Sequence, residues 1–249
     1  MGLSAWPGFR EGDVATGNLD QDTVYLGRTR AGTHYALGVR PGTSDWNTAN
    51  AAAWPQDEYQ LPAGLTGWAL DIGAHIGAVA VPLLLDSPDL RLVAVEALPE
   101  NVAQLMANLE RNGVGDRCQV VHAAASDSAQ PVRIGYGDEA DASGQHVYIG
   151  NASAPPGSRE IWLTGATLRG LELLRGSDQD APWAWAKIDC EGCEYSVFAE
   201  GADLSRLEFI TGEVHQGWAR LVDLLEPTHM VVGPGKDFGP FQAIIRVAP

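Results

Sequence analysis

Four side chains in the second half of the chain could hold a substrate hydroxyl or move its proton. Asp189 and Glu191 follow one apolar stretch, and Glu213 and His215 lie at the end of another. If both stretches are neighbouring parallel strands, all four side chains meet at one edge of the sheet. An imidazole titrates near pH ~6.5, so His215 could accept the proton while the carboxylates hold the substrate. The alternative is that these acids are solvated, or cap the following helix as Glu194 could.

The same residues are also candidate metal ligands. Asp189, Glu213 and His215 could bind a divalent ion such as Mg²⁺, which would lower the pKa of a bound hydroxyl. Magnesium prefers oxygen ligands, so the roles of base and metal ligand both stay open for His215. His146, in a loop-rich segment, is a second candidate base. His122 lies inside a predicted strand and is expected to be a core histidine.

A glycine turn and an acid in the first half of the chain indicate a nucleoside-type ligand. Gly73 and Gly77 follow the apolar residues 68–72, and their lack of a Cβ atom lets a ligand approach the backbone. Glu96 ends the next apolar stretch, where a carboxylate can accept hydrogen bonds from ribose hydroxyls. The spacing is G-x-x-x-G instead of the dinucleotide pattern G-x-G-x-x-G, and no G-K-S or G-K-T phosphate loop is present. The absence of a pyrophosphate-binding motif favours S-adenosylmethionine over NAD.

Strands and helices that would position these residues alternate from residue 67 onward. Strands are predicted at 68–72, 92–96, 119–123, 185–189, 209–214, 230–232 and 243–245, and a strand pair with a surface loop within 131–164. Helices are predicted at 76–83, 99–113, 168–174 and 218–225, with Pro82 expected to kink or delimit the first. This order predicts an α/β fold with a mostly parallel central sheet flanked by helices.

Three motifs together resemble those of the FkbM-type S-adenosylmethionine-dependent methyltransferase family. They are Leu-Asp-Ile-Gly-Ala-His-Ile-Gly at 70–77, Val-Glu-Ala-Leu-Pro-Glu-Asn at 95–101 and Lys-Ile-Asp-Cys-Glu-Gly-Cys-Glu at 187–194. Segments 123–127 and 212–215 fit the same pattern, so the resemblance covers about residues 65–215. It implies a Rossmann-like class I methyltransferase fold, S-adenosylmethionine as the cofactor, and O-methylation of a sugar or natural-product hydroxyl.

The resemblance also implies roles for residues of the cofactor site. Asp71, Gly73 and Gly77 would line the methionine part, Glu96 the ribose, and Ser126 and Asp127 the adenine region. His75 is expected to shape the cofactor turn, and Asn101 completes the candidate cofactor-binding set.

Two regions carry features that the motifs do not explain. Residues 1–60 contain short predicted strands at 23–26 and 34–37 and turn residues at 42–47, and we interpret them as an N-terminal cap or lid on a methyltransferase domain at 61–249. Cys190 and Cys193 form a C-x-x-C match without a second pair of ligands, so we expect them to pack as small hydrophobic residues.

Composition limits the partners. The 249 residues carry a formal net charge of −16, which disfavours nucleic acid and favours a cationic ligand. No apolar run is long enough to span a membrane, and the N-terminus does not read as a secretory signal. Three cysteines favour a reduced, cytoplasmic compartment. The expected partner is a small-molecule or oligosaccharide acceptor, and tryptophan-rich segments outside the predicted core make a homodimer plausible.

Two other classes of function remain open from the residues alone. The first is a nicotinamide- or nucleotide-binding Rossmann-like protein, either a dehydrogenase or a non-catalytic sensor. The second is a methyltransferase-like domain that has lost its chemistry and serves in an assembly; the joint presence of Asp189, Glu213 and His215 argues against it.

Overall fold

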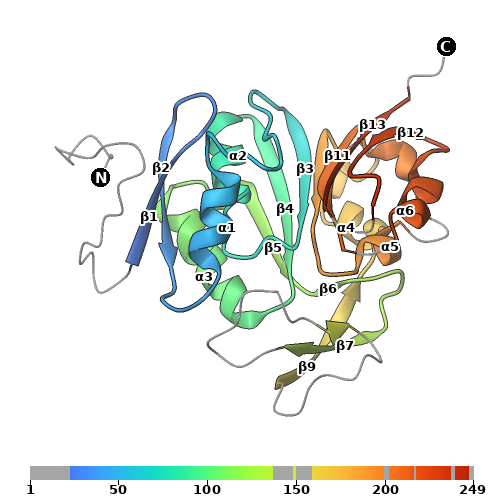
Figure 1. Ribbon diagram of the computed structural model, residues 1–249, viewed down its shortest axis with the longest axis horizontal. Coiled ribbons are helices and arrows are strands. Elements are labelled where there is room, and N and C mark those ends of the chain that lie inside the picture. Colours follow the sequence, from blue (N-terminus) through green and yellow to red (C-terminus); the bar gives the residue numbers. More distant parts are fainter. Residues whose placement is uncertain are drawn as a thin grey trace.

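The computed structural model describes residues 23–136, 148–149, 159–198, 202–215, 217–236 and 239–246. Its centre is a seven-stranded sheet with the strand order β12-β13-β11-β10-β3-β4-β5 (Figure 1). The strands are β3 (Gly67–Ile72), β4 (Leu90–Glu96), β5 (Cys118–His122), β10 (Trp185–Ile188), β11 (Phe209–Val214), β12 (His229–Val232) and β13 (Gly239–Ile245). The pairings from β11 to β5 are parallel, and β13 pairs antiparallel with β11 and β12. The predicted Rossmann-like α/β fold is therefore confirmed.

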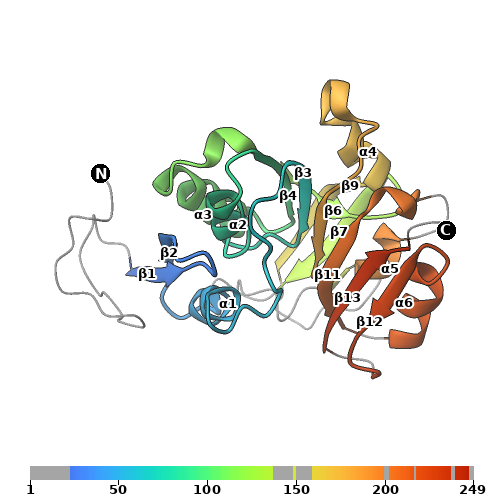
Figure 2. The same ribbon diagram turned by 90° about the horizontal axis from the view of Figure 1, so that it is seen from above.

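Helices cover both faces of the parallel part of the sheet, whose inner strands are mostly apolar on both sides. One face packs against α1 (Asp45–Ala52), α2 (Ala80–Asp86) and α3 (Pro99–Arg111), and the other against α4 (Leu168–Leu173), α5 (Glu194–Val197) and α6 (Trp218–Leu225). Figure 2 shows the two groups on opposite sides of the strands. Short 3₁₀ helices occur at η2 (Gly115–Arg117), η4 (Gly176–Asp178) and η5 (Leu204–Arg206).

Helix α2 begins later than its apolar spacing predicts. The pattern starts at Ile76, but the helix spans Ala80–Asp86 and has Pro82 as its third residue. A proline is tolerated there because the N–H groups of the first turn have no partner within the helix. Pro82 thus marks the beginning of the helix, and the residues before Ala80 are left to form the glycine turn.

The N-terminal part of the described chain forms a hairpin held by α3. Strands β1 (Thr23–Arg28) and β2 (His34–Val39) form where short strands are predicted, and they pair antiparallel. Asn108 bonds both backbone groups of Gly38, at 2.7 Å to the nitrogen and 3.2 Å to the oxygen. Asn112 does the same for Ala36, at 3.1 and 2.7 Å. One side chain of α3 and that of its C-cap residue therefore pair with the backbone groups along the outer edge of β2, as a further strand would.

Helix α1 corrects the turn predicted at 42–47. The helix begins at Asp45, within that stretch. Its sequence carries little amphipathic signal, so its stability comes from tertiary contacts that single-sequence reasoning does not see. Ala49 and Ala52 are buried in the core that also contains residues of α2 and α3, and Asp45 is paired with Arg40.

A smaller sheet with the order β6-β9-β7-β8 lies beyond β5. It consists of β6 (Ala124–Ala125), β7 (Pro131–Tyr136), β8 (Tyr148–Ile149) and β9 (Arg159–Ala166). The predicted strand pair within 131–164 is confirmed as the antiparallel pair β7–β9. His146, the second candidate base, lies outside the described residues.

Among the helices that the structure describes, none is both long and apolar enough to cross a membrane.

Candidate active site

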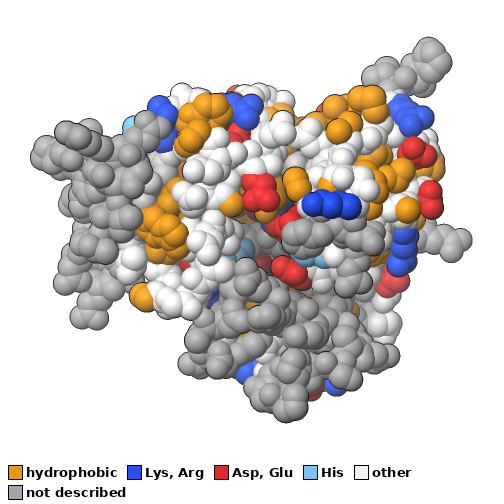
Figure 3. All heavy atoms as spheres, viewed as in Figure 1, with side chains coloured by type: hydrophobic (Ala, Val, Ile, Leu, Met, Phe, Trp, Pro, Cys, Tyr) orange, Lys and Arg blue, Asp and Glu red, His pale blue; other side chains and the backbone are white. Residues whose placement is uncertain are grey.

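A cavity of ≈ 320 Å³ opens at the carboxyl ends of β3, β4 and β10. One end of its wall contains the predicted cofactor residues Gly73, His75, Glu96 and Asn101. The other end contains Asp189, Glu191 and Glu213. Figure 3 shows acidic and histidine side chains gathered near the centre of this face. Seven of the predicted cofactor and acceptor residues therefore line one cavity, whereas Gly77 and His215 are not part of its wall.

Gly73 and Gly77 are required by packing against the protein itself. Gly73 has φ +76°, and a Cβ atom there would collide with the backbone carbonyl oxygen of Asp189. Gly77 has φ +85°, and a Cβ atom there would meet the Cδ1 atom of Leu105 at 2.8 Å. Both positions thus need glycine for backbone conformation and for space. Gly73 lines the cavity and joins the turn after β3 to the end of β10.

Glu96 has its carboxylate fixed by three donors. Its Oε2 accepts a hydrogen bond from the His75 backbone N–H at 2.8 Å. Its Oε1 accepts one from the Leu98 N–H at 2.8 Å and one from the Asn101 side-chain amide at 3.2 Å. A carboxylate offers about four acceptor sites, so acceptor capacity remains on a group that is already oriented at the cavity wall.

Asp71 lies behind the glycine turn, not on the cavity wall. It is fully buried, and its Oδ1 is 3.4 Å from Nζ of Lys187. The same Nζ donates to the carbonyl oxygen of Gly73. Burial acts to lower the pKa of Lys187, but the carboxylates of Asp71 and Asp189 outweigh it and raise this pKa above its usual value. The charged Lys187 therefore links the Asp71 carboxylate to the backbone of the glycine turn.

The end of the cavity beyond β5 is formed by small residues. Ala123, Ala124 and Ala125 line it, whereas Ser126 and Asp127 follow just outside the wall. The Ser126 N–H donates to the Ala166 carbonyl at 3.0 Å. The predicted adenine residues are thus adjacent to the cavity, and apolar surface within it comes from the three alanines together with Leu98 and Ile134.

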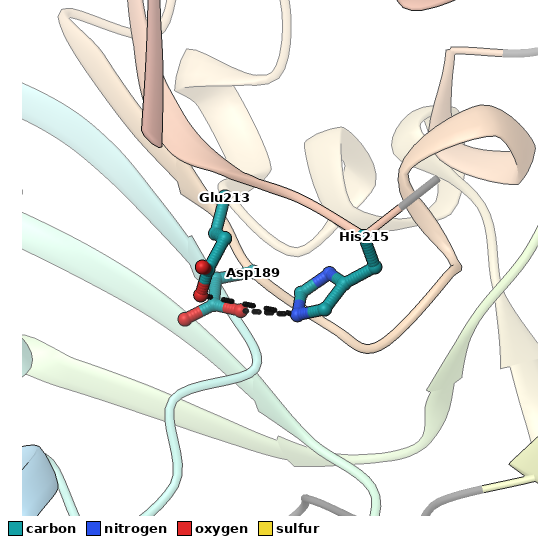
Figure 4. A group of neighbouring side chains, drawn as sticks. All are labelled: Asp189, Glu213 and His215. Atoms are coloured by element: carbon teal, nitrogen blue, oxygen red, sulfur yellow. Dashed lines mark ion pairs between the residues drawn. The ribbon is translucent and has the colours of Figure 1, made fainter. Parts of the chain in front are cut away.

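At the other end, Asp189, Glu213 and His215 come together as predicted (Figure 4). One ligand atom from each lies within 4.8 Å of the others. The Nε2 atom of His215 is 3.7 Å from Asp189 Oδ1, 3.9 Å from Glu213 Oε2 and 3.5 Å from Glu191 Oε2. Strand β10 ends at Ile188, and Glu191 reaches His215 because it adopts φ +56°, which reverses the chain. This geometry suits a divalent cation and also a hydroxyl group with its proton.

The pKa values of two groups in this cluster are raised above their usual values. Burial acts to lower the pKa of His215, but a hydrogen bond to Glu194 and the Glu191 carboxylate outweigh it and raise this pKa to about 9. Burial raises the pKa of Glu213 to about 7, and the Asp189 carboxylate adds to that shift. Near neutral pH, His215 therefore carries a proton, and Glu213 is close to its midpoint.

Tyr59 is a site residue that the sequence analysis does not identify. Its hydroxyl donates to Asp189 Oδ2 at 2.5 Å, and its ring lies 5.4 Å from Lys187 Nζ. Glu58 also lines the cavity. Tyr59 is separated from Asp189 by 130 positions, and no local pattern marks it. Glu194 lies in the first turn of α5, at the helix start that the sequence suggested, and it also bonds His215 Nδ1 at 2.8 Å.

Two expectations about individual residues are wrong. Cys190 and Cys193 form a disulfide instead of packing as thiols, and Cys118 is the free cysteine of the three. The left-handed conformations of Glu191 and Gly192 reverse the chain and bring the two Cα atoms to 5.4 Å, within reach of a disulfide. His122 is exposed on the edge strand β5 instead of lying in the core, with Nε2 3.1 Å from the Ala97 carbonyl oxygen.

Comparison with solved structures gives distant similarities. The precorrin-6y C5,15-methyltransferase from Geobacter metallireducens GS-15 is 16% identical, with 81% of this chain and 87% of that chain covered and a TM-score of 0.39. An O-methyltransferase from Bacillus cereus in complex with SAH is 14% identical, with 81% and 88% covered and a TM-score of 0.43. A putative caffeoyl-CoA O-methyltransferase from Staphylococcus aureus is 11% identical, with 73% and 77% covered and a TM-score of 0.42.

Comparison with curated protein sequences gives no match. The family model of the Methyltransferase FkbM domain, by contrast, matches residues 71–230. This range is more than half of the chain and contains the glycine turn, Glu96, Asp189, Glu213 and His215. The chain therefore belongs to the FkbM methyltransferase family, in the S-adenosylmethionine-dependent class.

Proposed function

We propose that this protein transfers a methyl group from S-adenosylmethionine to a hydroxyl group of a sugar, saccharide or related natural product. The observation that carries the proposal is one cavity lined by Glu96 and by Asp189 and Glu213, two members of the cluster that His215 completes. Its volume of ≈ 320 Å³ is within the range of small-ligand sites. Family membership supports methyl transfer over the nicotinamide-dependent alternative.

The cofactor is proposed to lie along the ends of β3 and β4. Its ribose hydroxyls would donate to Glu96, whose carboxylate is already oriented by backbone N–H groups. Its adenine would lie toward the alanines at 123–125, and its methionine part toward Gly73. In this position the sulfonium is surrounded by acids and faces the acceptor end, because Asp189 and Gly73 are in contact through the backbone.

At the acceptor end, the oxygen of the hydroxyl attacks the sulfonium methyl group. The new C–O bond forms as the S–C bond breaks, the electron pair stays on sulfur, and the hydroxyl proton must leave. His215 already carries a proton near neutral pH and cannot accept another. Glu213, with a pKa of about 7, is therefore the better acceptor of that proton in the metal-free protein.

A divalent cation is the second way to activate the hydroxyl. Asp189, Glu213 and His215 would hold it, because two carboxylate oxygens and an imidazole nitrogen lie within 4.8 Å of one another. Such an ion supplies Lewis acidity, which lowers the pKa of a bound hydroxyl. It would also replace the proton on His215 and offset the excess negative charge of the cluster.

The test is a methyl-transfer assay against a panel of sugars, glycosides and other polyols, read by mass spectrometry as the gain of one methyl group. We expect Glu96→Ala to weaken donor binding by about 10- to 100-fold, because hydrogen bonds to a charged group are lost. Glu110→Ala, on the exposed side of α3, should change nothing. Full activity in EDTA would remove the cation from the proposal, and donor binding without transfer to any hydroxyl would contradict the proposal itself.

A further inference from the structure

An ion pair in the N-terminal cap reaches the proposed cofactor site. Arg40 directly follows β2, and Asp45 is the first residue of α1. Both lie outside residues 71–230, the part that matches the FkbM domain. The Arg40 guanidinium donates to both carboxylate oxygens of Asp45, at 2.8 Å from Nε and 2.7 Å from Nη2. The Arg40 backbone N–H donates to the same carboxylate at 2.8 Å.

This ion pair is protected from solvent. Asp45 is fully buried, and the Arg40 side chain is 22% exposed. Burial acts to raise the pKa of Asp45, but the hydrogen bonds from Arg40 outweigh it and lower this pKa below its usual value. A buried carboxylate with a bidentate guanidinium partner is held in one geometry, so anything bonded to either group is held as well.

Arg40 controls the orientation of Asn101. Its Nη2 donates to Asn101 Oδ1 at 2.6 Å, and the amide nitrogen of Asn101 donates to Glu96 Oε1 at 3.2 Å. An asparagine amide can rotate by half a turn and exchange its oxygen and nitrogen. Because Arg40 can only donate, it selects the orientation in which the nitrogen faces Glu96. The Glu96 carboxylate can only accept and favours the same orientation, so without Arg40 the amide loses one of its two restraints.

Asp45 provides a second link, to His75. Its Oδ1 lies 3.6 Å from His75 Nε2. Neither ring nitrogen of His75 has a hydrogen-bond partner among the described residues, although the residue is 9% exposed and lines the cavity. Its backbone N–H is one of the three donors to Glu96. Asp45 is therefore a charged group placed to orient a buried imidazole at the cavity wall.

We propose that Arg40 and Asp45 are positioning residues of the cofactor site, which act through Asn101 and His75 on Glu96. This inference rests on the proposed binding of the cofactor ribose at Glu96. It makes the cap a contributor to donor affinity, and not only a cover on the methyltransferase domain.

The experiment measures the binding of S-adenosylhomocysteine by calorimetry to the full-length protein. Arg40→Met is expected to weaken binding about tenfold. This is the loss of affinity expected when one hydrogen bond that orients a charged group is removed. The matched control is Arg30→Met, which removes another arginine–aspartate pair of the cap, with Asp57, away from the cofactor residues. Arg30→Met should bind as tightly as the wild type.

A double-mutant cycle separates positioning from general destabilisation. If Arg40 acts through Asn101, then Arg40→Met combined with Asn101→Ala should bind no more weakly than Asn101→Ala alone. Additive losses would overturn the inference, as would binding by Arg40→Met within twofold of the wild type. If Arg40→Met does not fold, Arg40→Lys keeps the charge without the planar fork and is expected to show the same nonadditive loss.

The two proposals fail differently in this experiment. If the wild-type protein does not bind S-adenosylhomocysteine, the proposed function fails and this inference with it. If the wild type binds and Glu96→Ala binds weakly, but the Arg40 variants bind normally, only the role of the cap is wrong.

Discussion

The Nδ1 atom of His215 lies 2.8 Å from Oε1 of Glu194, a fully buried carboxylate at the first position of α5. The second oxygen of Glu194 has no hydrogen-bond partner among the described residues. A buried carboxylate is stable only when it is paired, so the imidazolium of His215 is its main counter-charge. The pair also orients the ring, because Nδ1 faces Glu194 while Nε2 faces Asp189, Glu191 and Glu213.

This pair predicts that stability depends on pH. The pKa of His215 is about 9 in the folded protein against 6.5 for an ordinary histidine, so the folded state binds more protons between these values. The contribution of this pair to the free energy of unfolding should therefore be complete below pH ~6.5 and fall as the pH rises to about 9. We expect a loss on the order of 2 kcal/mol from this group, measured by urea unfolding at pH 6 and pH 9.

Glu194→Gln should flatten that dependence, because the neutral amide no longer stabilises the imidazolium. His122→Gln is the matched control, since His122 is exposed on β5 and its replacement should leave the slope unchanged. Parallel curves for the wild type and Glu194→Gln would show that Glu194 does not hold the proton on His215.

Cation binding is predicted to release a proton. His215 carries one near neutral pH, and a metal ion at Nε2 requires the neutral ring. We expect Mn²⁺ or Mg²⁺ to bind more tightly as the pH rises from 7 to 9. At pH 8, where Glu213 with its pKa of about 7 is already mostly ionised, about one proton should be released per ion. Calorimetry in buffers of different ionisation enthalpy measures this number. His215→Asn should abolish the buffer dependence, and a wild-type protein that binds neither ion would exclude this cation site.

Short-range patterns made much of the site predictable. Glycine at 73 and 77, an acid at the end of β4 and the strand order are local signals, and they correctly place the cavity at one edge of a parallel sheet. The sequence also predicted that Asp189, Glu213 and His215 lie close together, because neighbouring parallel strands end at the same edge of the sheet.

Contacts between distant segments were not predictable. Tyr59 reaches Asp189 from a loop after α1, and α1 itself depends on packing and on the Arg40–Asp45 pair. The exposure of His122 depends on β5 being an edge strand, which one sequence does not reveal. Arg40 and Asp45 are only five positions apart, but neither their pairing nor the contact of Tyr59 with Asp189, 130 positions away, follows from periodicity.

The disulfide predicts a specific pattern of thiol labelling. Cys190 and Cys193 are bonded and Cys118 is free, so alkylation of the denatured, unreduced protein should modify one cysteine, and three after reduction. The bridge closes a very short loop, so its loss should cost only about 2 kcal/mol of stability. It also holds the segment that carries Glu191 beside His215, so Cys190→Ser with Cys193→Ser should lower methyl transfer. Cys118→Ser is the control, and labelling of three cysteines without reduction would contradict the bridge.

The last prediction concerns the contact between the glycine turn and the end of β10. Gly73 and Gly64 have almost the same backbone conformation, with φ +76° and φ +72°, but a Cβ atom has open space at Gly64 and meets the Asp189 carbonyl oxygen at Gly73. Gly64→Ala should therefore cost about 1–2 kcal/mol, the strain of a left-handed residue alone. Gly73→Ala should cost about 3–4 kcal/mol or more, because the collision adds to that strain.

The collision at Gly73 also has a consequence for chemistry. Relief requires the turn and the end of β10 to separate, which moves Asp189 relative to the wall that contains Glu96. Methyl transfer by Gly73→Ala should fall by a larger factor than its affinity for S-adenosylhomocysteine, since the acceptor residues shift against the donor. Urea unfolding, calorimetry and the transfer assay on both variants measure the three effects. Equal losses of stability in Gly73→Ala and Gly64→Ala would mean that the backbone of Asp189 does not lie against the turn.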